Sequence, residues 1–186
     1  ETDAPLSSRV RFFDMGIRIV TDSSCDLPAE VVAKHNITVV PLTIRFGEEE
    51  FQTISPKDFW AKCAASPTLP ETAAPSPGQF EAAFRQLKAE GATGILVINL
   101  SRALSATIQS ADLAARAVDG EIKVAVVDSK TVSLGTGLIV VDAATKAAAG
   151  ASLEELVARA EDLAERTKVF GVLNSLENLK KGGRIG

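Results

Sequence analysis

The chain has 186 residues, of which 46% are hydrophobic and 24% charged, a balance typical of a soluble globular protein. Its formal net charge of -4 argues against a general nucleic-acid-binding role, because phosphate backbones are bound by clustered Lys and Arg. No apolar run approaches the roughly 20 residues that a transmembrane helix requires.

The first 16 residues are polar, show no periodicity and end in Met15-Gly16. They lack the order of basic and then apolar residues that marks a signal peptide. We therefore predict that residues 1–16 are a tag or an upstream extension without regular structure, and that residues 17–186 form one domain. Two cysteines do not make a disulfide framework, which favours a reducing cytoplasm as the location of this domain.

From Ile17 onward, short runs of Val and Ile alternate with segments of helical periodicity. This alternation predicts an α/β fold with a mainly parallel sheet, flanked by helices on both faces. The predicted strands are residues 17–21, 37–40, 94–99, 122–127 and 169–173. Helices are predicted from Pro28 to about residue 36, after Ser55, at residues 79–90, up to about Val118, at residues 135–150, and after a capping box of Ser152 and Glu155.

Three stretches fall outside this alternation. Residues 41–51 are predicted to form a hairpin or an edge extension of the sheet. Residues 66–78 hold four of the eight prolines and are predicted to be an extended loop, because each proline lacks an N–H donor and restricts the residue before it. Residues 179–186 form a basic tail rich in glycine.

The carboxyl ends of the predicted strands are the expected place for a ligand in an open parallel sheet. The side chains expected there are mostly hydroxyls and a few carboxylates: Asp22, Ser23, Ser24, Ser101, Arg102, Ser105, Thr107, Asp128, Ser129, Thr131 and Ser133. The proline-rich loop adds Thr68 and Thr72. Hydroxyls and backbone N–H groups at a helix N-terminus can hold a carboxylate, whereas this set is poorly suited to a polyphosphate.

Catalytic and metal sites have weaker support. The single histidine, His35, falls where a helix is predicted to end, so a Ser-His-Asp triad is disfavoured. Cys25 lies near a helix start without an obvious basic partner, which favours an unreactive loop cysteine. Together with Cys63, these residues match no zinc-binding spacing.

Two further motifs have competing interpretations. Asp22 and Asp128 could form a carboxylate pair for acid–base chemistry, although capping of loop amides at strand ends is at least as well supported. Gly135-Thr136-Gly137 resembles half of a dinucleotide fingerprint, but two glycines in a helix more often indicate close packing. The residues alone therefore predict a ligand-binding α/β domain. A small-molecule hydrolase or transferase that uses Asp22, Ser23 or Asp128 at the carboxyl edge is the alternative.

Several segments, in order and at fitting separations, resemble the DegV family, whose characterised members are bacterial fatty-acid-binding subunits that serve a fatty acid kinase. The resemblance covers about residues 17–186. The matching motifs are Ile19-Val20-Thr21-Asp22-Ser23-Ser24 with Asp26-Leu27-Pro28, Ile-Thr-Val-Val-Pro-Leu at 37–42, Thr72-Ala73-Ala74-Pro75, Leu104-Ser105-Ala106-Thr107, Val127-Asp128-Ser129, and Lys181-Gly182-Gly183-Arg184-Ile185.

This resemblance implies an acyl carrier without catalytic residues, metal or cofactor, which binds a long-chain fatty acid and presents its carboxylate to an ATP-dependent fatty acid kinase. Thr72 and Ser105 match the family positions that hold the carboxylate. The acyl tail is expected in an aliphatic tunnel, where burial of each CH₂ contributes about 0.8 kcal/mol. Additional head-group or pocket candidates are Asp22, Ser23, Ser101, Arg102, Ala106 and Arg184.

The chain departs from the family pattern in three places. Ala73-Ala74 replaces Ser-Gln beside the expected head group, and Ala106 replaces a glycine, so that a methyl group could hinder close backbone approach. Family members also continue into a second α/β domain that closes over the lipid. The resemblance therefore implies a fragment or a truncated relative with a partly open acyl tunnel. A regulatory fragment that has lost binding is a third interpretation.

Overall fold

The computed structural model describes residues 16–184. Its centre is a four-stranded parallel sheet in the order β2-β1-β6-β7. The strands are β1 (Ile17–Asp22), β2 (Thr38–Val40), β6 (Gly94–Asn99) and β7 (Val124–Asp128). Four of the predicted strands are therefore confirmed, with ends shifted by at most two residues.

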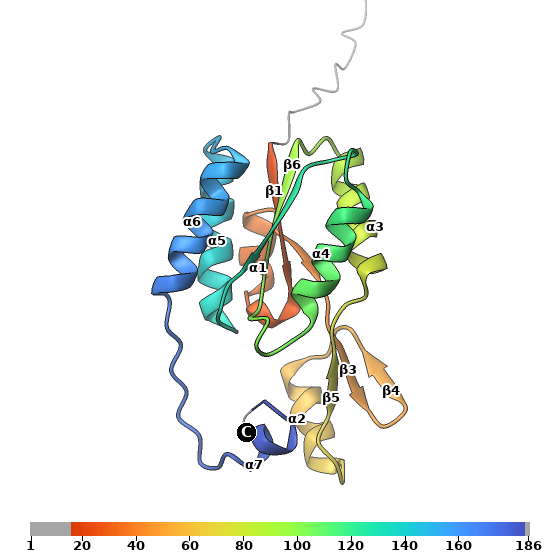
Figure 1. The fold of residues 1–186 in the computed structure, drawn as a ribbon. Helices are drawn as coiled ribbons and strands as arrows, with labels where there is room; N and C mark the ends of the chain where they lie inside the picture. The colour runs from red at the N-terminus through yellow and green to blue at the C-terminus, as the bar shows by residue number, and fades with distance from the viewer. Residues whose placement is uncertain (1–15, 185–186) are drawn as a thin grey trace, which may run out of the picture.

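Helices cover both faces of this sheet (Figure 1). One face carries α5 (Leu134–Ala148) and α6 (Leu153–Arg166), and α1 (Ala29–Lys34) also packs on this face through Val32. The other face carries α3 (Pro77–Ala89) and α4 (Thr107–Ala117). The predicted α/β architecture is thus confirmed.

The pleat of the strands divides the buried side chains into two cores, because successive side chains point to opposite faces. Ile19, Leu96 and Ile98 belong to the core under α5 and α6. Val20, which follows Ile19, and Val97, which lies between Leu96 and Ile98, belong to the core under α3 and α4. Apolar residues on both sides of each strand are what a sheet covered by two helix layers requires.

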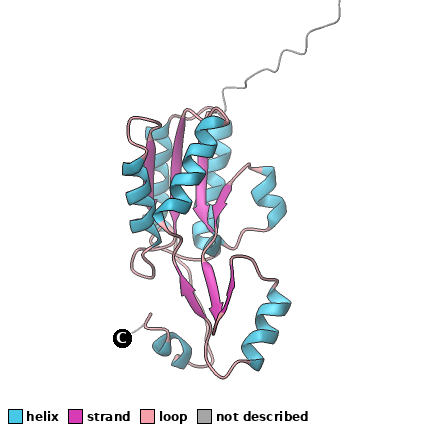
Figure 2. Cartoon of the chain, turned by 90° about the vertical axis from the view of Figure 1, so that its right-hand side faces the viewer, coloured by secondary structure: helices cyan, strands magenta, loops and turns pink. Residues whose placement is uncertain are grey.

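A smaller antiparallel sheet lies beyond the carboxyl ends of the parallel strands (Figure 1, Figure 2). Its order is β4-β3-β5, with β3 (Thr43–Phe46), β4 (Glu49–Phe51) and β5 (Glu71–Ala73). Of the two alternatives predicted for residues 41–51, the hairpin is confirmed and the edge extension of the parallel sheet is not. Helix α2 (Pro56–Ala65), which Ser55 caps as expected, packs on this sheet through edge-to-face contacts between Phe59 and Phe46, whose ring centroids lie 5.8 Å apart.

Residues 66–78 are only partly an extended loop, because they contain β5 and the first two residues of α3. The prediction missed β5 because its three residues lie between prolines and gain their order from a distant partner, β3, through the Ile44 and Thr72 pair. Residues 71–73 themselves contain no proline, so their N–H groups are free to join a ladder.

The prediction of a strand at residues 169–173 is wrong. This segment has no strand structure and runs through solvent from α6 to the short helix α7 (Glu177–Lys181), which occupies the predicted basic tail. Phe170 is 91% exposed and Val172 is 101% exposed. A strand needs a neighbour to satisfy its backbone groups, and none of the described strands pairs with this segment.

The predicted extension at residues 1–16 lies, apart from Gly16, outside the described residues. A short 3₁₀ helix, η1 (Ser23–Cys25), follows β1. Within residues 16–184, no helix has the length and apolar character needed to cross a membrane.

Candidate ligand-binding site

The carboxylate of Asp22 joins the ends of the two central strands. It is fully buried at the end of β1, and each of its oxygens accepts two hydrogen bonds. Oδ1 accepts from the backbone N–H and the hydroxyl of Ser24, at 2.9 and 2.5 Å. Oδ2 accepts from Asn99 Nδ2 and from the backbone N–H of Leu100, both at 2.9 Å. These bonds match the structural interpretation of Asp22, because they leave little capacity for a ligand.

The loops that follow β6 and β7 are tied to each other. The backbone N–H of Ser101 donates to the Thr131 carbonyl at 2.8 Å, and Ser101 Oγ accepts from the N–H of Ala103 at 3.2 Å. At the end of β7, Asp128 accepts a hydrogen bond from Arg102 Nε at 3.2 Å. The exposed guanidinium of Arg102 and the neighbouring loop hydroxyls therefore lie at the carboxyl edge, as the sequence predicted.

Ser105 lies where the loop after β6 enters α4. Its hydroxyl contacts Thr107 Oγ1 at 2.9 Å and accepts from the N–H of Thr107 at 3.3 Å. Ala106, the N-cap residue, offers no side-chain cap, so the N–H groups of the first turn that follow Thr107 remain available for an anion. Ser105 is half-buried and lines a cavity of about 320 Å³ together with Arg102, Ala106, Ile108, Gln109 and Asp112.

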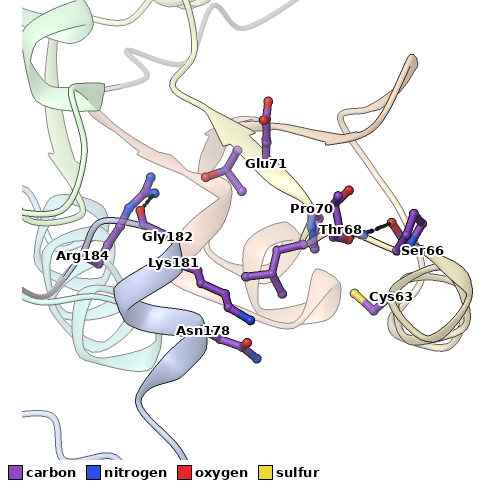
Figure 3. A pocket seen from close by; sticks show the side chains of 12 residues that line it. Cys63, Ser66, Thr68, Pro70, Glu71, Asn178, Lys181, Gly182 and Arg184 are labelled. Atoms are coloured by element: carbon purple, nitrogen blue, oxygen red, sulfur yellow. Dashed lines mark hydrogen bonds between the residues drawn. The ribbon is translucent and has the colours of Figure 1, made fainter.

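Thr72 is exposed in the middle of β5, and its hydroxyl forms no hydrogen bond with another described residue. It lines a larger cavity, of about 830 Å³, between the loop before β5 and the α7 end of the chain (Figure 3). Leu69 and flanking prolines give this cavity an apolar wall. Lys181 and Arg184 supply positive charge from the opposite wall, and neither forms an ion pair with a described carboxylate.

The structure places the sequence candidates in three groups. Thr72 and Arg184 share the larger cavity, and Arg102, Ser105 and Ala106 share the smaller one. The third group binds backbone N–H groups: Asp22 accepts from Leu100, Ser101 from Ala103, and Ser23 Oγ from Leu42 at 3.0 Å. The sequence reasoning gave no role to Leu69, Asn178 or Lys181, which also line the larger cavity. Their spacing carries no signal, because the cavity unites segments that are far apart along the chain.

The disfavoured motifs occupy structural positions. Burial raises the pKa of the Cys25 thiol, which disfavours the reactive thiolate form. His35 is the C-cap residue of α1. A Cβ added at Gly137 would lie 2.6 Å from the Cys25 carbonyl oxygen, so this glycine permits close packing of α5 on η1. Among residues 16–184, no group of three His, Cys, Asp or Glu side chains is placed to hold a metal ion.

Comparison with known proteins identifies the family to which this architecture belongs. The family model described as "Uncharacterised protein, DegV family" matches residues 16–186. The chain belongs to the DegV family. A DegV domain-containing protein of Streptococcus pyogenes is 38% identical over 173 residues, which are 91% of this chain and 61% of that protein. A DegV domain-containing protein of Streptomyces coelicolor is 36% identical over 173 residues, 91% of this chain and 60% of the relative.

Several solved DegV structures share the fold, and two of them are described by their fatty acid binding. A DegV family protein of Thermus thermophilus, solved in a study of its fatty acid binding, superposes with a TM-score of 0.81 at 34% identity, covering 92% of this chain and 61% of that one. DegV of Bacillus subtilis, described as a fatty acid binding protein, gives a TM-score of 0.82 at 28% identity, covering 91% and 61%. The chain therefore spans about three fifths of the length of these DegV relatives.

Proposed function

We propose that this chain binds one long-chain fatty acid, with the carboxylate between Thr72 and Ser105, and acts as an acyl carrier rather than an enzyme. The observation that carries the proposal is its likeness to DegV structures described as fatty-acid-binding proteins, at 34% identity for the Thermus thermophilus protein. The hydroxyls at the carboxyl edge support it, because they are donors suited to a carboxylate.

Thr72 and Ser105 line separate cavities. A carboxylate that contacts both hydroxyls would therefore have to lie between the two cavities. Thr72 has a hydroxyl without a partner among the described residues, and Ser105 lies beside the N–H groups of the first turn of α4. Arg184, which lines the same cavity as Thr72, adds a positive charge that favours the ionised acid. The apolar wall at Leu69 provides a start for the acyl chain.

The carrier would present this carboxylate to a separate, ATP-dependent fatty acid kinase in the cytoplasm. A non-catalytic role is supported by the state of the candidate nucleophiles and bases. The Cys25 thiol is buried with a raised pKa, and the carboxylate of Asp22 accepts four hydrogen bonds. Ser23 accepts a bond from a backbone N–H and has no base as a partner among the residues described. Asp128, the third candidate, accepts bonds from Arg102 Nε and from the N–H of Lys130. These contacts do not support the hydrolase or transferase alternative.

Native mass spectrometry of the protein purified from a bacterial host tests the binding proposal directly. We expect a co-purified mass that corresponds to a C14–C18 fatty acid, released on denaturation. A protein that carries no acid, and that also takes up none when incubated with oleate, would overturn the proposal.

Incubation with ATP and hydroxylamine separates the carrier from an enzyme, because hydroxylamine converts any acyl phosphate into a stable hydroxamate. We expect no hydroxamate from the purified chain and its bound acid alone, and hydroxamate only after a kinase fraction is added. Hydroxamate formation by the purified chain alone would show that it is catalytic.

A further inference from the structure

The loop that enters α4 holds Ser105 in a fixed position. The backbone N–H groups of Leu104 and Ser105 both donate to the Ser101 carbonyl, at 2.9 and 3.2 Å. On the other side, the N–H of Ser110 donates to the Ala106 carbonyl at 3.1 Å and begins the helical ladder. The backbone of Ser105 is therefore tied to the preceding loop, so the rotation of its side chain decides where its hydroxyl proton points.

The Ser105 hydroxyl bonds one residue in the described part of the chain, Thr107. Its Oγ lies 2.9 Å from Thr107 Oγ1 and accepts from the Thr107 backbone N–H at 3.3 Å. Thr107 is the first residue of α4 and is fully buried, whereas Ser105 is half-buried. Ser105 lines the cavity of about 320 Å³, and Thr107 lines neither that cavity nor the larger one.

Burial decides which of the two hydroxyls donates to the other. Within residues 16–184, Thr107 Oγ1 has no acceptor other than Ser105 Oγ. If Ser105 were the donor, the Thr107 proton would be buried without a partner, which is costly. If Thr107 is the donor, its proton is bonded and the Ser105 proton turns toward the cavity. The second arrangement leaves no buried donor unpaired.

We infer that Thr107 is a positioning residue that makes Ser105 a donor toward the ligand. A hydroxyl has one proton and two lone pairs. The N–H and the hydroxyl of Thr107 fill both lone pairs of Ser105 Oγ, so the Ser105 proton is left for a group in the cavity. An ionised carboxylate is such a group, because it only accepts. The inference rests on the proposed function, since it takes Ser105 as a donor to the fatty-acid carboxylate.

A double-mutant cycle tests the coupling between the two residues. Thr107→Val keeps the shape of the side chain and removes its hydroxyl, so the Ser105 hydroxyl can turn a lone pair toward the carboxylate. We expect the Kd for palmitate to rise roughly three- to tenfold. In a chain that already carries Ser105→Ala, the same change should alter the Kd by less than about twofold. An equal loss of affinity in both backgrounds would overturn the inference.

Two further variants separate positioning from packing. Thr107→Ser keeps the hydroxyl and loses the methyl group, so it should bind palmitate as the unmodified chain does. Thr145→Val is the matched control, because Thr145 is exposed on α5, outside both cavities, and donates to the Val141 carbonyl at 2.8 Å. Melting temperatures show whether each variant is folded. A loss of affinity in Thr107→Ser as large as in Thr107→Val would assign the effect to the methyl group and overturn the inference.

The ionisation of the bound acid gives a readout that packing alone would not move. A hydrogen bond donated to a carboxylate favours its charged form and lowers its pKa. Titration of bound palmitate, labelled with ¹³C at the carboxyl carbon, follows this pKa by NMR. We expect a higher pKa of the bound acid in Thr107→Val than in the unmodified chain, and no change in Thr107→Ser or Thr145→Val. An unchanged pKa in Thr107→Val would contradict the positioning role.

The same measurements separate this inference from the proposed function. A chain that takes up no fatty acid contradicts the proposed function and overturns the inference with it. A chain that takes up palmitate with equal affinity in the unmodified form and in Thr107→Val contradicts the positioning role alone.

Discussion

Thr72 and Ser105 differ in what their hydroxyls already do within the chain, and this difference makes their roles separable. Thr72→Ala removes a hydroxyl without a described partner, so it should lower fatty-acid affinity by about ten- to hundredfold without lowering the melting temperature. Ser105→Ala should cause a similar loss of affinity. It should also destabilise the fold by about 1 kcal/mol, because Ser105 bonds the first turn of α4.

Fatty-acid titration and thermal unfolding on the same samples check this prediction. Thr53→Ala, in an exposed loop outside both cavities, is the matched control and should change neither quantity. Unchanged affinity in both variants, with a lowered melting temperature for Ser105→Ala only, would remove both residues from the site.

Asp22 is expected to matter for stability rather than for binding. In Asp22→Asn, the amide NH₂ group would face donors that now bond a carboxylate oxygen, so the free energy of unfolding should fall by roughly 2–3 kcal/mol. Urea unfolding measures this change. Asp26→Asn is the control, because Asp26 is exposed in a left-handed conformation that Asn also adopts. Equal stability of the two variants would contradict the structural role of Asp22.

At the scale of elements, two helical glycines that look alike in the sequence differ in the space around them. Gly137→Ala would place a methyl group 2.6 Å from the Cys25 carbonyl oxygen and 2.9 Å from Leu27, so it should destabilise the fold by about 1–3 kcal/mol. Gly78→Ala would meet nothing closer than 3.9 Å in α3 and should be neutral, or stabilising by up to roughly 1 kcal/mol. Chemical denaturation of both variants tests the contrast, and a neutral Gly137→Ala would show that α5 can move away from η1.

The elements that could be predicted from the sequence are those with a strong local pattern. The Val- and Ile-rich central strands and the capping box of Ser152 and Glu155 carry their own signals, and the structure confirms them. The two misassigned segments depend on distant partners. Residues 71–73 are a strand because β3 lies beside them, and residues 169–173 are not a strand because no described strand does. Strand pairing is a tertiary property, so local composition misjudges both segments.

The same limit applies to the candidate site. The hydroxyls at the carboxyl edge could be predicted, because parallel strands end at a common edge. The larger cavity could not, because it forms where the loop before β5 meets α7. Nothing in the spacing of Leu69 and Lys181 indicates that they face each other.

For the whole molecule, the exposed apolar stretch between α6 and α7 predicts self-association. Phe170 and Val172 present apolar side chains to solvent over almost their full surface. We expect the sedimentation coefficient of the chain to rise with concentration, and a Phe170→Ser and Val172→Ser double variant to remain monomeric over the same range. Leu113→Ser is the control, because Leu113 is an exposed leucine on α4, and this variant should associate as the unmodified chain does. An unmodified chain that stays monomeric over this concentration range would show that the stretch does not mediate self-association.

The order of the strands along the chain also has a consequence for protein synthesis. The small antiparallel sheet and α2 are built from residues 43–73, which leave the ribosome consecutively and can pair as soon as they emerge. Strand β1 must wait for β6, because Ile17 pairs with Gly94. During that interval β1 has β2 as its sole strand partner, and its apolar faces lack the helices that later cover them. A nascent chain that has emerged from the ribosome as far as Ala73 would therefore combine a complete small sheet with an apolar strand β1 that lacks its cover, and this is the stage at which we expect chaperone contact.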